Sequence, residues 1–74
     1  MAEQPDELKK LVTVATDLVL SAELRIKAIG LIGSIDSHDA LLALLSLVAD
    51  ERLTKLEREL ALKRAGKIVK ASHL

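Results

Sequence analysis

The chain has 74 residues, in which 11 lysines and arginines balance 11 aspartates and glutamates, and it contains no cysteine, phenylalanine, tyrosine or tryptophan. Disulfide bonds, thiolate metal sites and cysteine nucleophiles are therefore excluded, and the balanced charge favours neither nucleic acid nor an anionic membrane surface. At this length, a core built from Leu, Ile, Val and Ala is only marginally stabilising without a partner.

The first predicted helix runs from about Pro5 to Val19. Proline needs no N–H partner in a first helical turn, and the two acidic residues after Pro5 suit the positive end of the helix dipole. The apolar residues of this segment recur at helical spacing, so we expect them to form one buried stripe. The stripe comprises Leu8, Leu11, Val12, Ala15, Leu18 and Val19.

A second helix is predicted from about Ala22 to Ser34, because Ser21 has a side chain typical of an N-cap. Its apolar residues are also expected to point toward the core. The inward positions are Leu24, Ala28, Leu31, Ile32 and Ile35.

The third predicted helix runs from about His38 to Ala49, with either Asp36 or Ser37 as its N-cap. The stretch from Ala40 to Ala49 is apolar almost all round, and such a helix is normally covered on more than one side. In so small a chain this predicts a protein partner. The stretch is far too short to span a bilayer and no leader segment precedes it, so we expect a soluble cytoplasmic protein.

The last helix is predicted to open at Thr54 and to run to about Lys70. Thr54 and Glu57 have the spacing of a capping box, in which each side chain accepts a hydrogen bond from the backbone N–H of the other residue.

The chain repeats itself at a spacing of about 33 residues. In this register Asp6 aligns with Asp39, Leu8 with Leu41, Arg25 with Arg58, Ala28 with Ala61, and Gly33 with Gly66. The two predicted N-caps, Ser21 and Thr54, coincide as well. We therefore predict an all-α fold, in which four helices form two stacked antiparallel helical hairpins. Residues 1–74 would form a single domain, with repeat one over about residues 5–35 and repeat two over about residues 37–70.

The stretch from Leu24 to Gly33 resembles the second helix of HEAT-like repeats of the phycobilisome-lyase type, in which an arginine, an alanine and a Gly-ended apolar turn recur. The stretch from Asp36 to Leu47 resembles the acidic turn and Leu-rich first helix of the following unit. The resemblance covers about residues 5–70. It implies a HEAT-like α-α superhelix and a habit of binding other proteins, and it does not imply a reaction.

Arg25 and Arg58 lie in the first turns of their predicted helices, where the dipole disfavours a cation. We expect an ion pair with Asp17 or Asp50 to compensate, and the resemblance implies the same bridge to an acid in the inter-helix turn. A solvated surface arginine is the alternative.

The small residues of the repeat are expected to serve packing. Ala28 and Ala61 would let paired helices approach closely, and Gly33 and Gly66 would relieve crowding near the helix ends.

No group of residues predicts catalysis, a cofactor or a metal ion. His38 and Asp39 are neighbours in a helix and do not face each other, and His73 lies in the tail. Acidic residues at helix N-termini are expected there as caps. The segment from Gly30 to Gly33 lies inside an apolar helix, so it is not a phosphate-binding loop. We therefore predict that the protein is not an enzyme.

Two surfaces are candidate interaction sites. The first is aliphatic and consists of Leu41, Leu42, Leu45 and Val48 on the third helix, with Leu11, Val14 and Leu18 as further members. The second is a basic strip on the last helix, consisting of Lys63, Arg64, Lys67 and Lys70. The simpler interpretation of the strip is a solvated face that compensates the negative end of the dipole.

These surfaces lead to the hypothesis of a small non-catalytic protein-interaction or scaffold module that self-associates, most simply as a two-fold homodimer. Two repeats leave hairpin faces uncovered, whereas stable arrays need three or more units. An alternative is a nucleic-acid-associated or regulatory accessory protein that uses the basic strip. A chromophore-lyase enzyme, suggested by the family name, is not favoured because the chain is short and lacks a catalytic group with a partner. Neither a membrane nor nucleic acid is the expected partner.

Overall fold

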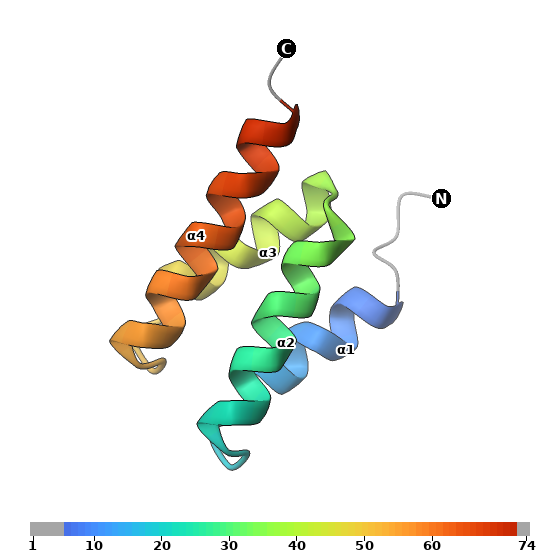
Figure 1. Cartoon of the computed structure of the whole chain (residues 1–74). Coiled ribbons are helices and arrows are strands. Elements are labelled where there is room, and N and C mark those ends of the chain that lie inside the picture. The colour runs from blue at the N-terminus through green and yellow to red at the C-terminus, as the bar shows by residue number, and fades with distance from the viewer. Residues whose placement is uncertain (1–5, 73–74) are drawn as a thin grey trace.

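The computed structural model describes residues 6–72 and contains the four predicted helices (Figure 1). They are α1 (Asp6–Ala15), α2 (Ala22–Ile35), α3 (His38–Val48) and α4 (Lys55–Ser72). Within this range there is no strand. A search of the same residues finds no helix with the length and apolar character needed to cross a membrane. Pro5 and His73 lie outside the described residues.

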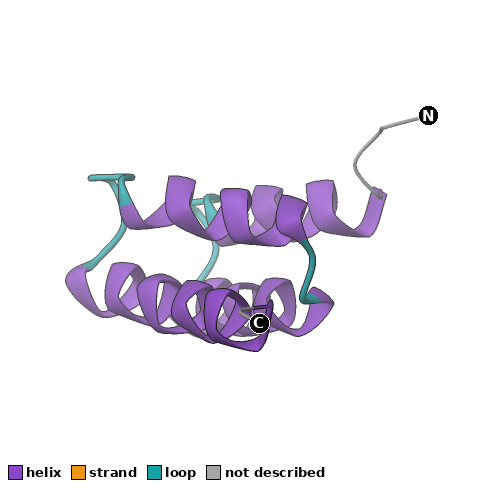
Figure 2. Ribbon diagram, turned by 90° about the horizontal axis from the view of Figure 1, so that it is seen from above, coloured by secondary structure: helices purple, strands orange, loops and turns teal. Residues whose placement is uncertain are grey.

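The four helices form two hairpins that stack on each other. α1 packs on α2, α3 packs on α4, and the two hairpins meet mainly through α2 and α4, with a smaller contact between α2 and α3. In Figure 1, α2 and α4 lie side by side at the front and run in the same direction, while α1 and α3 cross behind them. Figure 2 shows the resulting two layers, joined by the loops. The predicted fold class, all-α with two stacked antiparallel helical hairpins, is confirmed.

The helix starts follow the predicted caps. The Ser21 hydroxyl accepts a hydrogen bond from the Leu24 N–H at 3.3 Å, and the Ser37 hydroxyl accepts one from the Ala40 N–H at 3.0 Å. Ser37 is therefore the N-cap of α3. Asp36 instead ends α2 with a φ of 54°, a left-handed conformation that aspartate tolerates better than most residues.

α1 ends at Ala15, four residues before the predicted end, because the chain turns at Asp17. The Asp17 N–H binds the Val14 carbonyl in a tight turn, and the Asp17 carboxylate accepts a hydrogen bond from the Val19 N–H at 3.0 Å. Such local bonds compete with a continuing helix. Leu18 and Val19, which were expected in the core stripe, are exposed as a result, so that part of the prediction was wrong.

The hydrophobic core lies between the two layers and contains only aliphatic side chains, while Arg25 and Glu57 are also buried. Its buried members are Leu8, Ala15, Ala28, Ile29, Ile32, Ala40, Leu44, Leu47, Leu53, Ala61, Ala65 and Ile68. Leu24 and Leu31 were predicted to join them but are about half exposed. The apolar residues of α2 lie on nearly all sides of the helix, so their spacing alone does not identify its inward face.

Gly33 provides room for the close approach of α4. A Cβ atom at Gly33 would lie 3.0 Å from both Cβ and Cδ of Arg64, whereas a Cβ at Gly66 would meet no atom within 4 Å. The side chain of Arg64 thus lies against α2 at Gly33. The expected role of Gly33 in relieving crowding is confirmed, and the same expectation for Gly66 is wrong within the described residues.

This difference gives a matched prediction for the two glycines. Gly66→Ala should raise the free energy of unfolding by about 0.5–1 kcal/mol, because alanine favours a helix over glycine. Gly33→Ala should lower it, because crowding against Arg64 costs about 1–3 kcal/mol and exceeds that gain. Urea unfolding followed by circular dichroism measures both values. Equal stabilisation by the two substitutions would contradict the close packing at Gly33.

Candidate interaction surface

A buried ion pair joins the two hairpins. Arg25 on α2 lies against Glu57 on α4: its Nε donates to the Glu57 carboxylate at 3.0 Å and its Nη2 lies 2.8 Å from the same oxygen. Its Nη1 donates to the Leu20 carbonyl at 2.6 Å, so the same side chain also holds the α1–α2 loop. Both residues are buried. The prediction that Arg25 forms an ion pair with Asp17 or Asp50 was wrong, and so was the alternative that Arg25 is a solvated surface residue.

Glu57 also completes the capping box of α4. One carboxylate oxygen accepts the Thr54 N–H at 2.9 Å, and the Glu57 N–H donates to the Thr54 hydroxyl at 3.2 Å, as predicted. The other carboxylate oxygen binds Arg25. Burial raises the pKa of Glu57, but the Thr54 N–H and the hydrogen bond and charge of Arg25 outweigh burial and hold this pKa below its ordinary value.

The stability of the protein should depend on the ionisation of Glu57. Because its pKa in the folded state lies below the ordinary value of 4.5, its contribution is complete above that pH and is lost as the pH falls through the folded-state pKa. We expect the urea midpoint of the wild type to fall as the pH is lowered below about 4.5. Glu57→Gln should show a smaller fall over the same range, and identical pH profiles would contradict this role.

Arg58, the repeat counterpart of Arg25, makes different contacts. Its Nε donates to the Val48 carbonyl at 2.8 Å, near the end of α3. Asp50, the expected partner, binds Arg52 instead, with a side-chain separation of 2.8 Å. The Arg52 side chain and backbone N–H are the main causes that lower the pKa of Asp50 to about 2, and the charge of Arg58 contributes to the shift.

An apolar groove lies between α3 and α4. The groove has a volume of about 440 Å³ and is lined by Leu41, Leu45, Leu62, Ala65, Gly66, Val69 and Lys70. Leu45, Leu62 and Val69 are all close to half exposed. Exposed apolar surface of this kind is typical of an interaction site.

The groove includes only part of the predicted aliphatic surface. Leu41 and Leu45 line it, whereas Leu42 lies in a separate hollow beside Lys9 of α1. Val48 lines an adjoining hollow with Arg58 and Leu62. Sequence reasoning missed Leu62 and Val69, because α4 is strongly charged and its aliphatic residues were not considered as a surface. Their seven-residue spacing, which places them on one side of a helix, is a signal that could have identified them.

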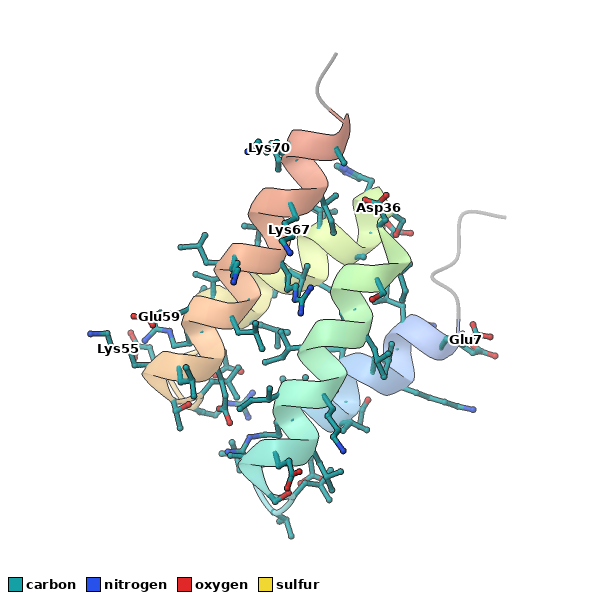
Figure 3. All side chains as sticks on the ribbon, in the orientation of Figure 1. Glu7, Asp36, Lys55, Glu59, Lys67 and Lys70 are labelled. Atoms are coloured by element: carbon teal, nitrogen blue, oxygen red, sulfur yellow. The ribbon has the colours of Figure 1, made fainter. Side chains whose placement is uncertain are left out.

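The structure separates Arg64 from the rest of the basic strip. Lys63, Lys67 and Lys70 are exposed on α4, and Figure 3 shows Lys67 and Lys70 along its C-terminal half. Arg64 instead packs against α2, with its Nε buried and without a hydrogen-bond partner in the structure. Figure 3 also shows Lys55 and Glu59 at the opposite end of the helix, where they lie 4.0 Å apart.

No metal centre is found among residues 6–72, since no group of three or more His, Asp or Glu residues there could hold an ion. His38 is exposed at the start of α3. A comparison of the chain with protein-family models, curated proteins and solved structures finds no match, so the resemblance to HEAT-like repeats stays a prediction from the sequence.

Proposed function

We propose that the protein is a non-catalytic interaction module of the HEAT-like type, which acts in the cytoplasm and associates with a second copy of itself through the groove between α3 and α4. The observation that carries this proposal is the cluster of half-exposed aliphatic side chains on one face, contributed by Leu45, Leu62 and Val69. Covering that face removes apolar surface from water, which is the main driving force of protein association. A two-fold dimer is the simplest arrangement, since each copy then offers the same face.

Sedimentation equilibrium at micromolar concentration tests this proposal. We expect the wild type to be dimeric and Leu62→Lys to be monomeric, because a charge in the groove opposes its burial. Leu56→Lys is the matched control: Leu56 lies on the same helix, is exposed and does not line the groove, so this variant should remain dimeric. A well-folded wild type that stays monomeric would overturn self-association.

The alternative function, nucleic-acid association, is supported by the line of exposed lysines at Lys63, Lys67 and Lys70. Because Arg64 packs on α2, the strip offers three cations rather than four. Phosphate contacts made by lysines are strongly weakened by salt. A gel shift that is present at low salt and absent at high salt would support this function, and no shift at low salt would exclude it.

A further inference from the structure

The face of α2 that contacts the second hairpin contains a row of three residues at helical spacing, Arg25, Ile29 and Gly33. Arg25 binds Glu57 and Gly33 receives Arg64, so both ends of the row contact α4. Ile29, between them, is fully buried. Because residues four apart lie on the same side of a helix, these three residues form one continuous covered row.

The repeat places the same row on α4, where it is open. Its members are Arg58, Leu62 and Gly66, each about 33 residues after its counterpart. Leu62 is 55% exposed where Ile29 is fully buried, and Gly66 has no neighbouring atom in the place that Arg64 occupies over Gly33. Leu62 and Gly66 also line the groove.

Arg58 differs from Arg25 in lacking a carboxylate. Its Nε donates to the Val48 carbonyl, whereas Arg25 donates through Nη1 to the Leu20 carbonyl, whose repeat counterpart is Leu53. No carboxylate in the described part of the chain comes within ion-pair distance of Arg58. The open row therefore repeats the spacing and the residue types of the covered row, but the residues that would cover it are absent from the described structure.

We infer that the groove is a socket for a third helical hairpin of the same type as α3–α4. The helix that docks there carries a carboxylate in its first turn, which binds Arg58, and a long side chain two turns later, which lies over Gly66. This pattern is that of Glu57 and Arg64 on α4. This inference rests on the proposed function only in that the groove binds protein. When a third hairpin occupies the groove, a second copy of the chain cannot bind there.

A second copy of this chain does not match the socket in the same way. Its Glu57 is already bound by its own Arg25. In its first hairpin, Leu24 occupies the position that corresponds to Glu57. Lys10 and Lys27 occupy the positions at which the second hairpin has the partly buried Ala43 and Leu60. Stacking that hairpin on the groove would bury two lysines and provide no carboxylate at this position.

The test is a chain extended in register, in which residues 1–68 are followed by a further copy of residues 36–74. Because the protein has no cysteine, a single introduced thiol reports on coverage of the groove. Leu62→Cys should react with a thiol reagent roughly tenfold or more slowly in the extended chain than in the original, since each factor of ten corresponds to about 1.4 kcal/mol of docking. Labelling is done well below the concentration at which the original chain self-associates.

Leu56→Cys is the matched control for labelling. Its counterpart in the first repeat, Glu23, stays exposed when the second hairpin packs on the first, so the labelling rate at position 56 should be the same in both chains. Glu57→Gln placed only in the added copy should restore most of the reactivity of the thiol at position 62. Arg58→Met should have a similar effect, and the two substitutions together should add little to either alone, because they remove the same contact.

Equal reactivity of the thiol at position 62 in the original and extended chains would overturn the inference. So would protection that survives both the Glu57→Gln and the Arg58→Met substitutions, because the occupant would then not be recognised by its carboxylate. A thiol at position 62 that is protected only at high protein concentration, in the original and the extended chain alike, would identify a second copy as the occupant. If the original chain is monomeric, only self-association fails, and the labelling result still decides the socket.

Discussion

Replacing Glu57 with glutamine should lower the free energy of unfolding by about 3–5 kcal/mol, the cost of leaving one member of a buried ion pair without its partner. Glutamine has nearly the same shape and retains the capping box with Thr54, so the loss isolates the contact with Arg25. That contact is the charged link between α2 and α4 in the described structure. Urea unfolding at pH 7 measures the change.

The exposed pair of Arg52 and Asp50 provides the control for Glu57. The Arg52 side chain is 62% exposed, so Arg52→Gln should cost less than about 1 kcal/mol. Arg25→Met combined with Glu57→Met should recover part of the loss, because apolar residues of similar volume often replace a buried ion pair without a net cost, while the bonds to the Thr54 N–H and the Leu20 carbonyl are still lost. If Glu57→Gln costs no more than Arg52→Gln, the ion pair does not hold the hairpins together.

Ile32→Ala should cost about 2–5 kcal/mol, whereas Leu31→Ala should cost about 0.5 kcal/mol or less. Ile32 is fully buried in the core, and truncation there leaves a cavity between the layers. Leu31 is the adjacent residue on α2 but is 54% exposed. Thermal or urea unfolding of both variants identifies which face of α2 points inward, and comparable losses at the two positions would contradict the helix orientation described above.

Much of the fold could be predicted because local chemistry determines it. The first N–H groups of a helix need hydrogen-bond acceptors, and residues that can provide them are recognisable in the sequence. Here they are Ser21, Ser37 and the pair of Thr54 and Glu57. The end of α1 could not be predicted in the same way. Asp17 stops the helix through its own backbone and side-chain bonds, while the apolar residues after it continue the helical pattern.

The inter-hairpin contacts were harder to predict because they depend on packing. The pairing of Arg25 with Glu57 joins residues on two different hairpins, and Glu57 already had a sufficient explanation in its capping box. One signal was present in the repeat: the first copy has Leu24 where the second has Glu57. A carboxylate needed in only one of two similar units indicates a contact between the units.

The exposed surface shows a similar limit. The apolar character of α3 correctly directed attention to Leu41 and Leu45, which line the groove. The opposite wall comes from α4, whose polar sequence concealed Leu62 and Val69. Whether a residue of a repeat faces a neighbour or solvent depends on its place in the stack. Two equivalent positions of the repeat can therefore differ in exposure, as Ile29 is buried and Leu62 is exposed.

The buried ion pair that joins the two stacked hairpins is tested most directly by hydrogen exchange at the arginine side chains of the wild type, measured by nuclear magnetic resonance. The Nε–H of Arg25 donates to Glu57 in a buried site, whereas that of Arg52 donates to Asp50 at the surface. We predict that the Arg25 Nε–H exchanges much more slowly than the Arg52 Nε–H, because it is released only when the hairpins separate or unfold. Equally fast exchange at the two positions would contradict the account.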